Sequence, residues 1–128
     1  MTRRVVITGL GALSPLGADV ASTWSALISG KSGVVRLPHD WHPDIPAQIA
    51  APVAQDPSEL IDRVELRKLD RSEAFALSAA REAWSDAGAP PVESERLGVV
   101  IASGIGGVLT LLGAYDFLKE KGARLVSP

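Results

Sequence analysis

Two short stretches of the chain carry apolar residues at consecutive positions, a pattern typical of strands that are buried on both faces. Residues 5–8 read Val-Val-Ile-Thr, all β-branched, and residues 97–102 read Leu-Gly-Val-Val-Ile-Ala. β-branched side chains favour extended backbone because they pack well on a pleated surface. We therefore expect one buried strand at 5–8 and another at 97–102.

Two other segments repeat their apolar residues at helical spacing. The first helix is expected to follow Asp19, which can cap it, and to reach about Ser29, with Gly30 ending it. The last is expected over residues 108–119, with Gly122 ending it. The faces predicted to lie inward consist of Val20, Trp24, Leu27 and Ile28 in the first helix, and of Leu111, Leu112, Tyr115 and Leu118 in the last.

A longer helix is predicted between them, capped by Asp70. Glu73 stands three residues later, as in a capping box, and Gly88 followed by two prolines ends the helix. Upstream, Ser58 is suited to cap a short helical segment over 59–66. The alanine-rich face of the longer helix predicts close packing and consists of Ala76, Leu77, Ala80, Ala83, Trp84 and Ala87.

Residues 34–57 form a proline-rich segment that we expect to be irregular, without a long helix or central strand. The order of the other elements alternates strands with helices, which predicts a layered α/β fold with a mainly parallel sheet. Two strands are too few for a stable sheet. We therefore interpret residues 1–128 as part of one domain and expect further strands in a longer chain.

Composition and charge exclude several classes of protein. Apolar residues make up 46% of the 128 residues, so a packed core is expected and disorder is not. The net charge of −2 gives no overall attraction to nucleic acid. The N-terminus lacks the long apolar run of a secretory signal and no segment is long enough to span a membrane, so we expect a cytoplasmic protein.

Candidate chemistry is sparse. The chain has no cysteine, which excludes a cysteine nucleophile within it. The Gly-Leu-Gly run at 9–11 lacks the third glycine of a dinucleotide-binding fingerprint, because Ser14 stands there. The Gly-Lys-Ser run at 30–32 follows a helix, not the strand of a phosphate-binding loop. His39 and His42 lie in a proline-rich loop with too few convergent ligands. We expect no cofactor and no metal site.

Five segments of the chain together indicate a protein family. They are residues 5–17 (VVITGLGALSPLG), 22–33 (STWSALISGKSG), 67–71 (RKLDR), 103–107 (SGIGG) and 124–128 (RLVSP). In this order and spacing they resemble the N-terminal part of the β-ketoacyl-acyl-carrier-protein synthases, most closely the elongating type II enzymes of fatty acid synthesis. Each segment alone is a weak signal, but the resemblance covers the whole chain.

This resemblance implies a thiolase-like fold of two similar halves, each a mixed sheet covered by helices, with this chain an incomplete N-terminal half. It implies a homodimeric acyltransferase that condenses a cysteine-bound acyl group with malonyl-carrier protein and releases carbon dioxide. In the family the cysteine and two assisting histidines lie in later segments. We therefore expect no catalytic residue here, and His39 and His42 match neither histidine.

The resemblance also implies one substrate-binding residue. Ile105 lies in the glycine-rich bend at 103–107, at a position where the family has an apolar residue that limits the room for the acyl chain. Glycines suit this role because they permit close backbone approach. The alternative is a tight structural turn with Ile105 in the core.

A carrier-protein-binding patch is implied by the basic pair Arg67-Lys68, whose family counterparts contact the acidic acyl carrier protein. Arg63 and Arg71 extend the patch at helical spacing, and Arg124 matches another basic position. The alternative is a solvated helix face on which Arg63 pairs with an acidic residue four positions earlier, Glu59.

Two further hypotheses remain open at this point. The chain could belong to a chain-length partner subunit of a polyketide synthase, which keeps the fold but lacks the nucleophile. It could instead be a self-contained small binding domain, which would unfold cooperatively and stay monomeric.

Overall fold

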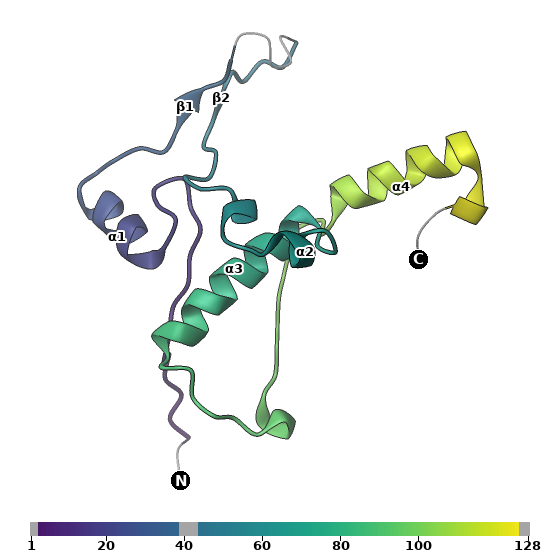
Figure 1. Cartoon of the computed structure of the whole chain (residues 1–128). Helices are drawn as coiled ribbons and strands as arrows, with labels where there is room; N and C mark the ends of the chain where they lie inside the picture. Colours follow the sequence, from purple (N-terminus) through teal and green to yellow (C-terminus); the bar gives the residue numbers. More distant parts are fainter. Residues whose placement is uncertain (1–2, 39–43, 126–128) are drawn as a thin grey trace.

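The computed structural model describes residues 3–38 and 44–125 of the chain (Figure 1). His39 and His42 lie outside the described residues. The elements in chain order are α1 (Val20–Ile28), β1 (Val35–Arg36), β2 (Ile49–Ala50), the short 3₁₀ turn η1 (Pro57–Glu59), α2 (Arg63–Leu66), α3 (Arg71–Asp86), η2 (Ser94–Arg96), α4 (Val108–Lys121) and η3 (Ala123–Leu125).

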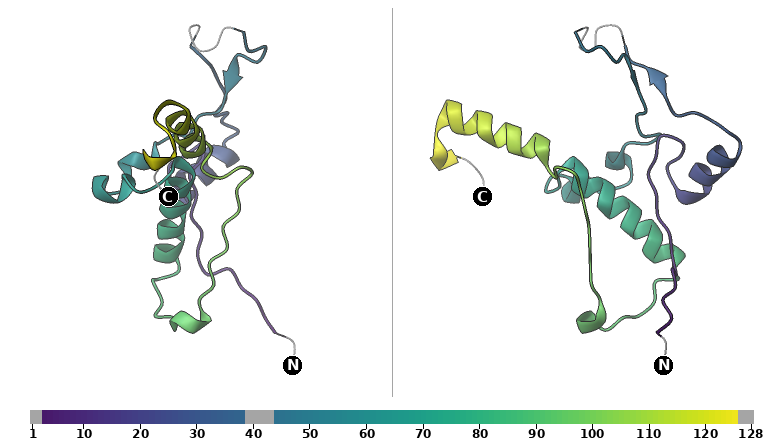
Figure 2. Two further views of the ribbon diagram at one scale, coloured as in Figure 1. Left: turned by 90° about the vertical axis from the view of Figure 1, so that its right-hand side faces the viewer. Right: turned by 180° about the vertical axis from the view of Figure 1, so that it is seen from behind.

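Helix α3 is the centre of the fold, and the N-terminal segment runs alongside it in an extended conformation (Figures 1 and 2). Gly9 and Gly11 make this approach possible. A Cβ added at Gly9 would lie 2.1 Å from the Ala83 carbonyl oxygen, and one at Gly11 would lie 1.9 Å from that of Ala79. The close packing predicted for the alanine-rich face is therefore confirmed at Ala83, and its partner is the glycine-containing segment.

Two carboxylates of α3 hold the backbone of this segment. The Leu10 N–H donates to Asp86 at 2.9 Å, and the Ala12 N–H donates to Glu82 at 2.8 Å. The other Glu82 oxygen accepts from the Val20 N–H, also at 2.8 Å, at the start of α1. Glu82 therefore fixes both the extended segment and the first turn of α1, where a negative charge is favourable.

The predicted strands at 5–8 and 97–102 are not hydrogen-bonded strands in this structure. Val5 is 93% exposed and Val100 is 96% exposed, so the prediction of burial on both faces is wrong for this chain. The physical reason is that neither segment has a neighbouring strand among the described residues, and a strand gains its backbone hydrogen bonds only from neighbours.

The sheet lies instead within the proline-rich segment at 34–57. Strands β1 and β2 pair antiparallel, with Val35 opposite Ala50 and Arg36 opposite Ile49. Each strand has two residues. The segment is otherwise without regular structure among its described residues up to η1, in agreement with the expected irregularity.

The predicted helix caps are mostly confirmed. Asp19 caps α1 in a capping box with Ser22, and Asp70 caps α3 in a capping box with Glu73. Ser58 is not a cap: its N–H instead donates to the Asp56 cap of η1, and Asp62 caps α2. The glycines expected to end the three longer helices all have positive φ, at Gly30 (68°), Gly88 (78°) and Gly122 (80°).

The faces of α1 and α4 that were predicted to lie inward are mostly exposed, and of their residues only Val20 is half-buried. Trp24 is 60% exposed in α1, Leu111 is 65% exposed in α4, and α4 carries no buried residue. Figure 2 shows α4 projecting away from the rest of the chain. The buried apolar side chains of the described residues are few: Ala26, Pro57, Ile61 and Ala74.

Candidate functional site

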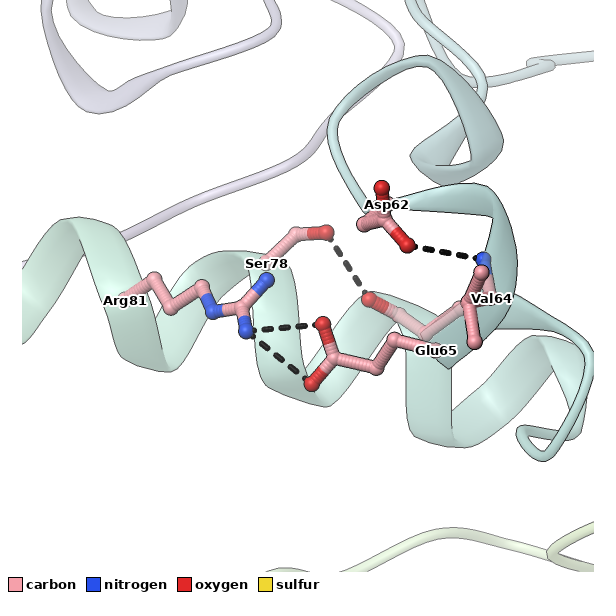
Figure 3. Close-up of polar contacts among 6 residues, drawn as sticks. Asp62, Val64, Glu65, Ser78 and Arg81 are labelled. Carbon is pink, nitrogen blue, oxygen red and sulfur yellow. Dashed lines mark hydrogen bonds and ion pairs between the residues drawn. The ribbon is translucent and has the colours of Figure 1, made fainter.

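The basic pair Arg67-Lys68 stands at the C-terminal end of α2, which is fixed against α3 (Figure 3). Both carboxylate oxygens of Glu65 accept hydrogen bonds from one Arg81 nitrogen, at 3.0 and 2.8 Å. The Asp62 side chain accepts from the Val64 N–H at 2.8 Å and so starts the helix. These contacts set the direction in which the basic pair leaves α2.

The predicted docking residues on α2 are available to a partner. Arg63, Arg67 and Lys68 are exposed, and none of them forms an ion pair with another residue in the part of the chain that the structure describes. The alternative pairing of Arg63 with Glu59 is not formed, because Glu59 instead accepts a hydrogen bond from Gln55 at 3.2 Å.

Arg71 does not extend this free patch. Its guanidinium lies 2.6 Å from the Asp56 carboxylate, and its Cζ is 5.0 Å from the centre of the Phe75 ring. The Arg71–Asp56 pair fastens the first turn of α3 to η1. Glu65, an acidic neighbour of the basic pair, is paired with Arg81. Of the basic residues predicted around α2, Arg63, Arg67 and Lys68 are therefore the ones without an ion pair among the described residues.

Arg124 is not brought together with the residues of α2. It belongs to η3, at the far end of α4, and the helix runs away from α2 in Figure 1 and in the right-hand view of Figure 2. A helix of 14 residues is roughly 21 Å long. The two predicted parts of the docking surface are therefore separate in this structure.

Ile105 lies at the tip of the glycine-rich bend and is 73% exposed. The bend is closed by the Ser103 hydroxyl, which accepts a hydrogen bond from the Gly106 N–H at 3.0 Å. Gly106 has a φ of 69°, a conformation that favours glycine. The alternative that places Ile105 in a core does not hold here, because no described residue covers most of its side chain.

Asp70, the N-cap of α3, connects the start of that helix to the segment that follows the glycine-rich bend. Its Oδ2 accepts from the Thr110 hydroxyl at 2.6 Å, although the two residues are 40 positions apart. Gly107 packs on the same carboxylate, because a Cβ added there would lie 3.0 Å from Asp70 Cγ. Sequence reasoning identified Asp70 only as a cap of α3, and no local pattern indicates the contact with Thr110.

Hydrogen bonds keep three carboxylates of the chain ionised. The Thr110 hydroxyl and the Ser72 backbone N–H lower the pKa of Asp70 to about 2. The Ser58 backbone N–H and the Arg71 side chain lower the pKa of Asp56 to about 2. Ser22 lowers the pKa of the Asp19 cap. Each group favours its charged form because the donors bind the carboxylate and not the acid.

The described residues do not form a metal site. They contain no group of three or more His, Cys, Asp or Glu side chains that could hold a metal ion. Across 3–38 and 44–125, no helix has the length and apolar character needed to cross a membrane. The geometry is that of an exposed basic surface beside a glycine-rich bend.

Comparison with known proteins identifies the family of the chain. Residues 2–128 match the family described as "Beta-ketoacyl synthase, N-terminal domain", and the chain belongs to that family. It is 46% identical to a 3-oxoacyl-[acyl-carrier-protein] synthase 2 of Coxiella burnetii and 39% identical to one of Vibrio harveyi. Each match covers 98% of this chain but 31% of the relative, so the chain spans about a third of their length.

Solved structures agree with the family. A β-ketoacyl synthase from Burkholderia phymatum superposes with a TM-score of 0.73 and is 30% identical, covering 99% of this chain and 32% of that one. The ishigamide ketosynthase/chain length factor gives 0.70 and 26%, covering 98% and 32%. The expected family and the thiolase-like fold are therefore confirmed, with this chain matching a third of that fold.

Proposed function

We propose that this chain forms the N-terminal part of a 3-oxoacyl-acyl-carrier-protein synthase of fatty acid biosynthesis. The main support is the match over residues 2–128 to the N-terminal domain of β-ketoacyl synthases, together with relatives that are named as such synthases. The chain supplies scaffold, pocket wall and docking surface. Because it has no cysteine, the nucleophile must come from residues outside this sequence.

The proposed reaction uses an acyl group held as a thioester on that cysteine. Loss of the malonyl carboxylate as carbon dioxide leaves an enolate on the carrier-bound partner. The enolate carbon attacks the acyl carbonyl, the cysteine leaves as a thiolate and takes up a proton, and the product is a 3-oxoacyl-carrier protein. We further propose that the complete enzyme is a cytoplasmic homodimer, which rests on the family alone.

Acyl carrier protein is the proposed partner of the α2 surface. Arg63, Arg67 and Lys68 are exposed and unpaired among the described residues, while the neighbouring Arg71 and Glu65 are engaged in ion pairs. Free cations at the rim of a binding surface act mainly on the rate at which an acidic partner associates. Asp70, two residues after the basic pair, is hydrogen-bonded to Thr110, just beyond the Ile105 bend. Docking on this surface would therefore bring the carrier close to the proposed acyl pocket.

Charge reversal of the basic pair tests this docking. In the synthase that carries this segment, Arg67→Glu with Lys68→Glu should lower the association rate with acyl carrier protein by roughly tenfold at low salt. Stopped-flow fluorescence at several salt concentrations measures this rate. Added salt should shrink the difference, because exposed charges are screened.

A matched control is Arg3→Glu with Arg4→Glu. It makes the same change in charge on an exposed adjacent pair in the N-terminal segment, which begins at the other end of α3 (Figure 1). Equal slowing by both double variants would mean that only net charge matters and would refute the docking patch.

A chain-length partner subunit is the second candidate, favoured by the likeness to the ishigamide ketosynthase/chain length factor. Incubating the purified protein with an acyl thioester and mapping any bound acyl group by mass spectrometry separates the two. A synthase becomes acylated on a cysteine, whereas a partner subunit without the nucleophile does not.

A further inference from the structure

The start of α4 has no capping side chain of its own, because its N-cap residue is Gly107. The first N–H groups of a helix lack intrahelical partners. Here the Asp70 carboxylate supplies the missing acceptor from another helix. Its Oδ2 accepts from the Thr110 hydroxyl at 2.6 Å and, more weakly, from the Thr110 backbone N–H at 3.4 Å. Thr110 is the third residue of α4, where a capping side chain normally binds.

The same carboxylate caps α3. Its Oδ1 accepts from the Ser72 backbone N–H at 2.9 Å and from the Ser72 hydroxyl at 3.0 Å. The two oxygens are thus divided between two helix starts, an arrangement that we name the Asp70 clasp. An asparagine has one acceptor oxygen, so it cannot accept hydrogen bonds at both helix starts through separate oxygens, and an alanine can accept at neither.

We infer that Asp70 is a positioning residue, which holds the Ile105 bend in a fixed place relative to the Arg67-Lys68 surface. The basic pair comes just before Asp70 in the sequence, and the bend comes just before α4. Because α4 has no buried residue, the Asp70 clasp is a principal tie between its first turn and α3. The meaning of this link for carrier docking and acyl length rests on the proposed function.

Hydrogen exchange of the full chain over residues 103–112 tests the Asp70 clasp itself. Thr110→Val removes the hydroxyl donor but leaves the bonds of Asp70 to α3. Exchange at the start of α4 should rise roughly threefold to tenfold, the size expected for losing one hydrogen bond of ordinary net strength. Thr110→Ser should restore the protection. Unchanged exchange in Thr110→Val would overturn the clasp.

Two further variants keep the test specific. Thr23→Val removes a hydroxyl that lies 2.8 Å from Ser14 Oγ near α1, so it should leave residues 103–112 unaffected. On an Asp70→Ala background, which leaves no side chain to bind the Thr110 hydroxyl, Thr110→Val should add little, because residues that share one interaction are not additive. Full additivity of the two effects would contradict a direct link.

Product analysis of the synthase that carries this segment tests the positioning role. Thr110→Val should change the distribution of acyl lengths, with rescue by Thr110→Ser, and leave the association rate with carrier protein unchanged. A looser start of α4 with an unaltered acyl distribution would refute positioning. An unmodified enzyme without condensing activity would instead refute the proposed function, and the exchange data would still decide the clasp.

Discussion

The carboxylate of Asp70 accepts hydrogen bonds from two helices, so its protonation should loosen both. Its pKa is lowered from 3.8 to about 2 by the Thr110 hydroxyl and the Ser72 N–H. A lowered folded pKa means that the unfolded chain binds more protons between these values. The stabilisation is therefore fully present above about pH 4 and is lost as the pH falls through about 2.

Urea unfolding of the synthase that carries this segment, between pH 5 and pH 2, measures this effect as the difference between the unmodified protein and Asp70→Asn. Other titrating groups, including Asp56, are common to both proteins and cancel. The difference should shrink toward pH 2. A difference that stays constant over the range would mean that ionisation of Asp70 does not contribute.

Ile105 is the residue on which the proposed pocket depends. With the side chain 73% exposed at the tip of the bend, a larger residue fits without a clash among the described residues. Ile105→Phe in the synthase that carries this segment should shorten the acyl chains that are accepted, and Ile105→Val should not. Competition assays with acyl-carrier proteins of graded length read this out. An unchanged profile for Ile105→Phe would remove Ile105 from the pocket wall.

At the scale of elements, the contact between the N-terminal segment and α3 depends on the absence of a side chain. A Cβ at Gly11 would lie 1.9 Å from the Ala79 carbonyl oxygen, so the segment or the helix must move. In the synthase that carries this segment, Gly11→Ala should lower the free energy of unfolding by about 1–3 kcal/mol, as overpacking usually does. Gly98→Ala is the control, since nothing lies within 4 Å of its added Cβ. Equal urea midpoints for the two variants would contradict this contact.

Local signals in the sequence predicted the helices well. Asp19, Asp70 and the glycines at 30, 88 and 122 act within one or two turns, so the caps and ends of the helices follow from neighbouring residues. Ser58 failed as a cap because two aspartates nearby, Asp56 and Asp62, serve instead.

Burial could not be predicted in the same way. The apolar patterns at 5–8, at 97–102 and on α4 predict that these segments pack against neighbouring elements. No such neighbours are present among the described residues, so the apolar side chains are exposed. The basic pair of the candidate site was recognised from a family motif. Its link to the Ile105 bend, through Asp70 and Thr110, depends on a contact across 40 positions that only the fold reveals.

The whole molecule has far more surface than a self-contained domain of its size. A compact monomer of 13.4 kDa is expected to expose roughly 6,500 Å², whereas this chain exposes 10720 Å². The excess is about 4,200 Å², as large as a permanent subunit interface. It includes apolar residues of the predicted strands and of α4. This surface argues against a self-contained binding domain and supports a proposal in which further residues of a synthase cover it.

Condensation itself tests the central claim most directly. The synthase that carries this segment is incubated with an acyl-carrier protein and with malonyl-carrier protein labelled at its free carboxylate. Our account predicts release of labelled carbon dioxide together with a 3-oxoacyl-carrier protein two carbons longer than the acyl substrate. Absence of the longer product, with or without carbon dioxide release, would contradict it.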